Sequence, residues 1–282
     1  MKQILVATDL SERSDRAVER AILLTRQFGA RLTVLRVIDE DLPASVADRQ
    51  KQAAETALRR HLSSMPKARA LDIDAATDFG KDWKGILQRA DAERAGLIVL
   101  GLHRERGIDG MFRGTTVERV ARNSDAPVLV VKNRPATDYG KVVVGVDFSV
   151  YSRRAAAFAL HFAPGAKLAL VHAYDIPFKR YLTGSDMHAE LKKRDATHFS
   201  QMVGREMAAF LTGLEIGAER VQKVMREGGP REVIQHQVAE LGAGLLVVGT
   251  HGRTGVARAL LGSIAEAFLI DPPCDVVAVK AW

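Results

Sequence analysis

The sequence Gly249-Thr-His-Gly-Arg-Thr-Gly-Val-Ala-Arg-Ala-Leu-Leu-Gly-Ser263 follows a short apolar run, Leu245-Leu-Val-Val-Gly249, which is typical of a buried parallel strand. A helix is predicted directly behind it, because Ser263 can cap a helix start, Glu266 stands three positions further on, and apolar residues then recur at helical spacing. The glycines therefore occupy a strand-to-helix connection. Free backbone N–H groups and the helix dipole face an anion at such a connection, so the stretch predicts a phosphate site; a Gly-rich surface loop is the alternative.

The residue types in this stretch suit close contact with a phosphate. Gly249 and Gly252 would let the backbone approach without a Cβ in the way. Gly262 and Ser263 would offer N–H groups and a hydroxyl at the start of the helix.

Working outward, strand-like apolar runs alternate with helix-like segments along the whole chain. This alternation predicts parallel βαβ units with right-handed crossovers. Ser11 or Ser14 is expected to cap the first helix, and Gly29 to end it. In the first half the predicted strands are 2–7, 31–37, 71–76, 96–101 and 127–131, and the predicted helices are 13–28, 44–64, 82–95 and 115–122.

The same order of elements starts again after residue 140, so the chain is an internal duplication. The polar segment 133–140 is predicted to be the linker between domains 1–134 and 140–282. The second half carries an insertion, with a long helix expected from about Ser185 to Leu211. The repeated segments are 141–149 with 2–11, 162–173 with 28–37, 245–249 with 97–101, 262–263 with 114–115, and 274–280 with 126–132.

The composition is that of an ordinary globular protein of 282 residues. Cys274 is the single cysteine, so no internal disulfide can form; with no Cys/His cluster at zinc spacing, the sequence favours a cytoplasmic protein without a bound metal. No apolar run is long enough to span a membrane. The net charge of +7 is spread over both halves without a basic patch, which argues against nucleic-acid binding.

Two consecutive units of this pattern resemble the tandem members of the universal stress protein family. The family motif is G-x2-G-x9-G-[ST], and every position of it is matched here, at Gly249, Gly252, Gly262 and Ser263. The family's Asp at the end of the first strand matches Asp147, and Asp9 in the first half. The resemblance covers almost the whole chain. It implies an α/β fold of two tandem open five-stranded parallel sheets of order 3-2-1-4-5, with helices on both faces, similar to Rossmann-like folds and the adenine nucleotide alpha hydrolases.

The resemblance also implies ATP, with or without Mg²⁺, as the ligand of the second half. In this fold the strand order reverses between the first and fourth strands, where ligands bind; Asp147 and Gly249 end these two strands. By analogy the motif holds the triphosphate, Asp147 lies near the ribose, and the backbone of Ala173 contacts adenine. Pro230 either only starts the third helix or also lines the mouth of the site. The implied nucleotide-binding residues are Gly145, Val146, Asp147, Ala173, Gly249, Thr250, His251, Gly252, Gly262, Ser263 and Ile264.

The first half departs from the motif, because Arg104 stands where the second glycine should be. A side chain there puts a backbone cradle for phosphate in doubt. The first half is therefore expected to bind something smaller, or in another pose, or nothing. The residues of this degenerate second site are Asp9, Val37, Gly101, Arg104, Gly114 and Thr115.

The sequence thus predicts an ATP-binding protein with a nucleotide-dependent regulatory role in the stress response, acting on an unknown protein partner. No catalytic set is recognisable, and at most weak hydrolysis is expected, with His251 the one candidate near the phosphates. The alternatives are a slow ATPase or nucleotidyl transferase, or a nucleotide-free scaffold acting by dimerisation. Domains of this family pair through the fifth strand; here 127–131 can pair with 275–279 inside one chain, and two chains could pair again as a homodimer.

Overall fold

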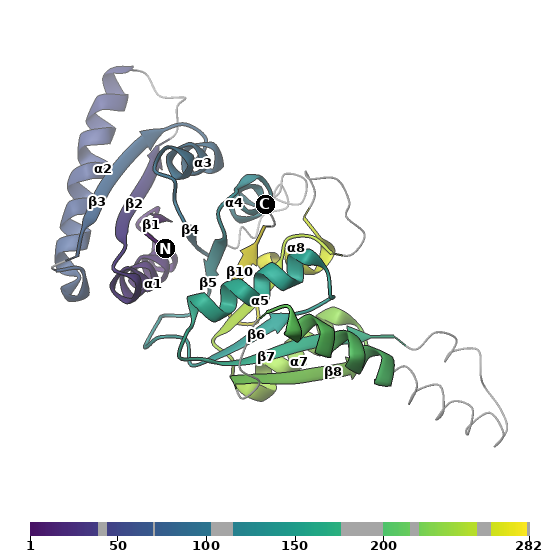
Figure 1. Ribbon diagram of the computed structural model, residues 1–282. Helices are drawn as coiled ribbons and strands as arrows, with labels where there is room; N and C mark the ends of the chain where they lie inside the picture. The colour runs from purple at the N-terminus through teal and green to yellow at the C-terminus, as the bar shows by residue number, and fades with distance from the viewer. Residues whose placement is uncertain are drawn as a thin grey trace, which may run out of the picture.

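The computed structural model describes residues 1–38, 44–69, 71–102, 115–175, 200–214, 220–252 and 261–280, with only the backbone of 44–47. Strands and helices alternate in both halves, as the sequence predicts (Figure 1). The elements of the first half are β1 (Gln3–Ala7), α1 (Glu12–Phe28), β2 (Arg31–Ile38), α2 (Ala44–Ser64), the short 3₁₀ helix η1 (Pro66–Ala68), β3 (Ile73–Phe79), α3 (Asp82–Ala92), β4 (Leu97–Gly101), α4 (Thr116–Asn123) and β5 (Val128–Val131).

The second half repeats this order, with a helix over 200–212 in the place that α2 has in the first half. That helix is the described part of the long helix predicted from about Ser185; residues 176–199 lie outside the described residues. The other elements are β6 (Lys141–Gly145), α5 (Val150–Phe162), β7 (Lys167–Tyr174), β8 (Val221–Glu227), α7 (Pro230–Leu241), β9 (Leu245–Gly249), α8 (Ser263–Ile270) and β10 (Asp275–Val279).

The strands form one ten-stranded sheet of order β3-β2-β1-β4-β5-β10-β9-β6-β7-β8. Within each half the strands are parallel and follow the order 3-2-1-4-5 that the family resemblance implies. In each half the order therefore reverses beside the first strand, between β1 and β4 and between β6 and β9. A crevice at the carboxyl ends of these strands is where a ligand is expected.

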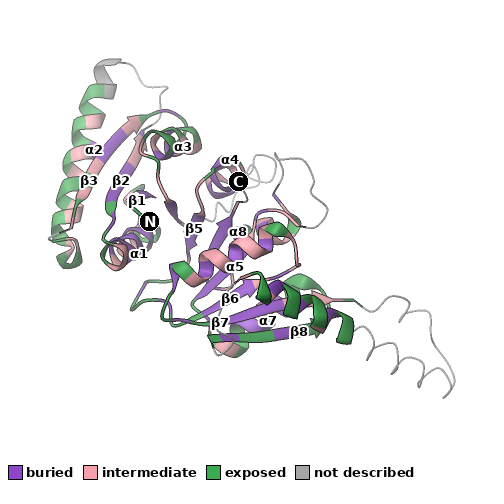
Figure 2. Cartoon of the chain, viewed as in Figure 1, coloured by how far each residue is buried: buried purple, intermediate pink, exposed green. Residues whose placement is uncertain are grey.

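Two apolar layers cover the two faces of the sheet, because successive strand residues point to opposite sides. Ile4 and Val6 belong to the layer under α1, α2, α5 and the 200–212 helix, whereas Leu5 belongs to the layer under α3, α4, α7 and α8. Most strand residues are consequently buried (Figure 2). The near-continuous apolar strands of the sequence are explained by this double coverage.

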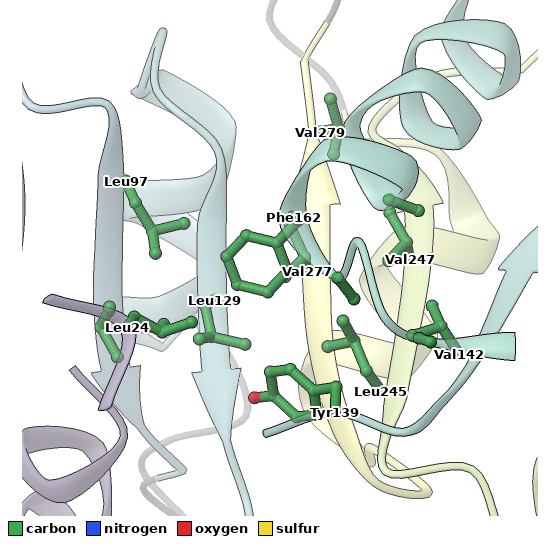
Figure 3. Packing of buried hydrophobic residues seen from close by; sticks show 14 of the residues in the cluster. Leu24, Leu97, Leu129, Tyr139, Val142, Phe162, Leu245, Val247, Val277 and Val279 are labelled. Atoms are coloured by element: carbon green, nitrogen blue, oxygen red, sulfur yellow. The ribbon is translucent and has the colours of Figure 1, made fainter. Parts of the chain in front are cut away.

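The two halves join through an antiparallel pair of strands, as predicted. Val276 of β10 lies opposite Val130 of β5, and Val277 opposite Leu129. Leu129 and Val277 share one apolar cluster with Tyr139 and Phe162 (Figure 3). The halves therefore share a continuous sheet and a continuous core.

A buried ionic cluster lies at this junction around Asp275, whose side chain is 2% exposed. Its Oδ1 accepts hydrogen bonds from the backbone N–H groups of Lys132 (2.9 Å) and Asn133 (3.3 Å). Its Oδ2 accepts one from the Tyr139 hydroxyl (2.7 Å) and lies 3.6 Å from Nε of Arg20. The Arg20 guanidinium also stacks on the Tyr139 ring, 4.0 Å from its centroid. One carboxylate thus connects β10 to β5, to the segment before β6, and to α1.

Two elements of the first half differ from their predicted bounds by a few residues. β3 starts at Ile73 and continues to Phe79, past the predicted end at Ala76, because β2 remains a hydrogen-bonded neighbour as far as Ile38. α3 ends at Ala92 instead of residue 95, since Arg94 adopts a left-handed conformation with φ of 51°. The predicted helix 44–64 has the observed bounds.

Candidate functional site

A tight turn follows the first strand of each half and fixes an aspartate at the crevice. The backbone N–H and the hydroxyl of Ser149 both donate to Oδ1 of Asp147, at 3.0 and 2.5 Å. Phe148 between them takes a left-handed φ of 61°. Ser149 also caps α5 by accepting from the N–H of Ser152 (3.1 Å). One oxygen of Asp147 therefore builds the turn, and the other, Oδ2, is directed toward Gly252.

The same turn is present in the first half, so the turn is part of the duplicated fold. The N–H of Ser11 donates to Oδ1 of Asp9 (2.9 Å), and Leu10 has a φ of 64°. Of the two predicted caps, Ser11 caps α1, which starts at Glu12, and Gly29 ends the helix in the left-handed conformation as predicted. Burial alone would raise the pKa of Asp9, but hydrogen bonds from Ser11 and Ser14 outweigh it and lower the pKa below its ordinary value. Asp9 is therefore an anion at neutral pH.

The carboxyl ends of β6 and β9 border a cavity of about 310 Å³, near the lower limit for small-molecule sites. It brings together every nucleotide-binding residue predicted for the second half except Thr250. Thr250 is 2% exposed and lies behind the wall, where its N–H donates to the carbonyl of Val279 (3.0 Å). The predicted residues in the lining are Gly145, Val146, Asp147, Ala173, Gly249, His251, Gly252, Gly262, Ser263 and Ile264.

Two of the motif glycines are required by packing inside the protein. A Cβ on Gly249 would lie 3.0 Å from the backbone carbon of Tyr151 in α5. A Cβ on Gly262 would lie 3.3 Å from the carbonyl oxygen of Thr250. Gly249 was expected to let a ligand approach the backbone. In the structure it lets helix α5 approach instead.

Gly252 differs from these two glycines, because its missing Cβ points to the aspartate of the crevice. A Cβ there would be 3.2 Å from Oδ2 of Asp147. The φ of Gly252 lies outside the left-handed region, so a strained backbone conformation does not explain the glycine. Space beside the carboxylate is what this position preserves.

The start of α8 is open toward the cavity. Its N-cap is Gly262, and none of the described side chains caps it, so the predicted cap by Ser263 is wrong. The N–H of Gly262 donates to the Thr250 carbonyl (2.7 Å) and is not available to a ligand, contrary to expectation. The N–H groups of Ser263, Ile264 and Ala265 are the ones without an intrahelical acceptor, and all three residues line the cavity. Backbone donors at a helix start can bind an anion.

His251 lines the cavity between the motif glycines. Its Nδ1 lies 2.9 Å from the Thr250 hydroxyl, and its ring packs on Tyr151 with centroids 5.0 Å apart. Burial, and then the charge of Lys280, lower the pKa of His251 below its ordinary value, so the ring is neutral at pH 7. Within the described chain its buried Nε2 has no hydrogen-bond partner. His251 therefore offers a ligand one polar atom and no charge.

The opposite end of the cavity is mostly apolar and contains residues that the sequence analysis did not identify. Nδ1 of His172 lies 2.7 Å from the Val146 carbonyl, and its ring packs 4.2 Å from that of Phe148. Pro230 is in the lining, so it contributes to the site as well as starting α7. The unidentified lining residues are Ser152, Val171, His172, Ile234, Val248 and Ala265; the apolar ones also fit an ordinary core, so only tertiary packing reveals them.

A second cavity, of about 340 Å³, lies at the same place in the first half. Asp9, Val37, Gly101 and Thr115 line it as predicted; Arg104 and Gly114 lie outside the described residues. A Cβ on Gly101 would be 2.8 Å from the Arg13 carbonyl oxygen, so this glycine too is required by helix packing.

The helix end at this second cavity is closed. The Glu118 carboxylate accepts from the N–H of Thr115 (2.6 Å), and the N–H of Glu118 donates to the Thr115 hydroxyl (3.2 Å). This capping box satisfies the start of α4 and puts a negative charge there. The two cavities thus have similar volumes, and each has a helix N-terminus at its edge. The N-terminus of α8 is open to an anion, whereas that of α4 is occupied by the Glu118 carboxylate.

Cys274 is buried, and its thiol is not activated as a nucleophile. Burial, reinforced by the Asp275 charge, raises the pKa of its thiol to about 12. We expect the native protein not to react with Ellman's reagent at pH 8, and to release one equivalent of chromophore per chain in urea. Full reaction under native conditions would contradict this burial.

No helix among the described residues is long and apolar enough to cross a membrane.

Comparison with known proteins agrees with this architecture. Universal stress protein E of Salmonella typhi is 23% identical over 303 residues, covering 99% of this chain and 94% of that protein. A universal stress protein of Thermus aquaticus is 33% identical over 141 residues, 49% of this chain and 97% of its own length. The crystal structure of a universal stress protein from Archaeoglobus fulgidus has the same fold, with a TM-score of 0.67 at 22% identity and coverage of 99% and 98% of the two chains. The sequence profile of the Universal stress protein family matches residues 1–132 and again 138–280, so the chain is a member of this family with two of its domains in tandem.

Proposed function

We propose that this chain binds one molecule of ATP in the crevice of its second half, and that occupancy of the crevice regulates its contact with a protein partner in the stress response. The observation that carries the proposal is the open start of α8 in the same cavity as Gly249 and Gly252, with the Asp147 carboxylate also in its lining. The two features suit the two ends of a nucleoside phosphate, one anionic and one rich in hydroxyl groups.

In the proposed complex the phosphates lie at α8. The N–H groups of Ser263, Ile264 and Ala265 and the helix dipole supply the attraction, since no Lys or Arg is among the described lining residues. Mg²⁺ bound with ATP would neutralise part of the remaining charge. The protein groups at this end donate hydrogen bonds. Because His251 is neutral, it carries no charge that would repel Mg²⁺ or neutralise the phosphates in its place.

The nucleoside lies toward β6 and β7. In this arrangement Oδ2 of Asp147 accepts hydrogen bonds from ribose hydroxyls, while Oδ1 holds the turn. Ala173 and Ile234 give this end of the cavity an apolar wall that suits a purine base. The proposal thus assigns a different kind of protein group to each part of the ligand.

The first test is to purify the chain without added nucleotide, denature it, and quantify released small molecules by mass spectrometry. About one ATP or ADP per chain is expected, with added ATP raising the melting temperature. Two per chain would mean that the first cavity also binds nucleotide despite Glu118. None, together with an unchanged melting temperature, would favour the nucleotide-free scaffold. Steady turnover of about 1 per second or faster would favour an enzyme.

The variant Asp147→Asn is expected to weaken ATP binding about tenfold, the size of one lost hydrogen bond to a charged group. Asparagine keeps an oxygen for the Ser149 N–H, so the turn should persist. Titration calorimetry with ATP and with inorganic triphosphate measures the two ends separately, and triphosphate affinity should not change. Asp9→Asn, the same substitution in the duplicated turn, is the matched control and should leave ATP binding as in the wild type. Equal effects of the two variants would contradict the assignment of the ribose to Asp147.

A further inference from the structure

The two halves carry the same capping sequence but use it differently. Thr115 and Glu118 of the first half correspond to Ser263 and Glu266 of the second, and both pairs fit the capping-box pattern S/T-x-x-E. The first pair forms the box with both hydrogen bonds. In the second half Gly262 is the N-cap and α8 starts one residue earlier. Local sequence therefore does not account for the open end of α8.

The difference lies in a contact between the halves. α4 packs beside α8 where the two halves meet (Figure 1). There Oε1 of Glu266 lies 3.6 Å from Nη2 of Arg122, so this carboxylate is directed to the other domain instead of back to Ser263. The residue of α8 that corresponds to Arg122 is Ile270, which cannot hold Glu118 in the same way.

The contact has a consequence for an anionic ligand. A Glu266 carboxylate turned back onto Ser263 would occupy the helix end and repel phosphate, as the box of Glu118 does in the first half. Arg122 and Glu266 are each more than a third exposed, so their ion pair is weak and screened by solvent. The two orientations of Glu266 are thus close enough in energy for one side chain to decide between them.

We propose that Arg122 of the first domain is a positioning residue of the site in the second domain: it holds Glu266 away from the start of α8 and leaves this helix end to the phosphates of the ligand. The first domain then supports nucleotide binding in the second without touching the nucleotide. The identity of the ligand rests on the proposed function, whereas the orientation of Glu266 does not.

The test uses Arg122→Ile, which copies Ile270, in the full-length chain. We expect its ATP affinity to fall about tenfold, the size of a charge effect at a helix N-terminus, while adenosine affinity stays as in the wild type. Adding Glu266→Ala should restore ATP binding, because no carboxylate is left to turn back. Arg122→Lys should retain it. A merely structural role of Arg122 would weaken adenosine binding too, and Glu266→Ala would not rescue it.

A second measurement needs no ligand. In nucleotide-free protein, Arg122→Ile should slow hydrogen exchange of the Ser263 amide about tenfold, because Glu266 then accepts its hydrogen bond, and the double variant should reverse this. Unchanged exchange at Ser263 would overturn the inference, whatever ATP does. If exchange slows but the wild type binds no ATP, the inference holds and the proposed function fails.

Discussion

Replacing Asp275 with alanine is expected to lower the free energy of unfolding by about 3–5 kcal/mol, the cost of removing one partner of a buried ion pair. Asp275 and Arg20 have side chains that are only 2% and 7% exposed. Without the carboxylate the Arg20 charge stays in the core, and burial of an uncompensated charge is among the most destabilising single changes.

Hydrogen bonding at the junction adds to this loss. The Tyr139 hydroxyl and the N–H groups of Lys132 and Asn133 all donate to Asp275. Burial, followed by the Asp275 charge, holds the pKa of Tyr139 well above its ordinary value, so its hydroxyl remains a donor that needs an acceptor. The three donors precede β6, and their acceptor Asp275 lies in the last strand of the second half. Losing the carboxylate should therefore weaken the β5–β10 junction before it destabilises either domain.

Urea unfolding followed by circular dichroism measures the effect, with Asp271→Ala as the matched control. Asp271 forms an ion pair with Arg231 at 3.3 Å, but both side chains are 47% exposed, so this change should cost less than about 1 kcal/mol. Replacing both members of the buried pair, as Arg20→Met with Asp275→Leu, should be less harmful than Asp275→Ala. A similar loss for Asp271→Ala and Asp275→Ala would refute the role of burial.

Much of the fold could be predicted because it depends on local pattern and on repetition. The helix 44–64 and the strand 96–101, which is observed as Leu97–Gly101, are recognisable from their local residue pattern, and the duplication implies that the second half repeats the first. β3 was misplaced because Thr77 and Asp78 interrupt its apolar pattern, and only the neighbouring strand carries it to Phe79. Pairing between strands distant in sequence is invisible to a local pattern.

The composition of the site was predictable, but the function of its individual groups was not. The motif brings Gly249, Gly252 and Gly262 into one lining. Whether a glycine faces a ligand, a helix or a carbonyl depends on which backbone lies beside it, and the sequence does not show this. The predicted cap of α8 was wrong for a similar reason. Glu266 forms an ion pair with Arg122 in the other domain and does not bond to Ser263, three residues away.

Gly252→Arg is expected to weaken ATP binding by at least about 100-fold, a loss of roughly 2.7 kcal/mol in binding free energy. The new Cβ would start 3.2 Å from Oδ2 of Asp147, so the guanidinium would form an ion pair with the carboxylate on which the ribose depends. Arginine is also the residue that the first half carries at this position of the motif, Arg104. The variant thus converts the intact motif into the degenerate one.

An added positive charge near a phosphate site would by itself favour ATP, so the sign of the effect discriminates between two interpretations. If charge decides, Gly252→Arg binds ATP more tightly; if space beside Asp147 decides, binding is lost. Gly165→Arg adds the same charge at an exposed turn, where a Cβ would meet nothing within 4 Å, and controls for net charge. Calorimetry with ATP, and the melting temperature of each nucleotide-free variant, separate lost binding from lost folding. Unchanged affinity in a folded Gly252→Arg protein would place the nucleotide elsewhere, because no ligand that contacts Asp147 from this cavity could share the space with an arginine side chain.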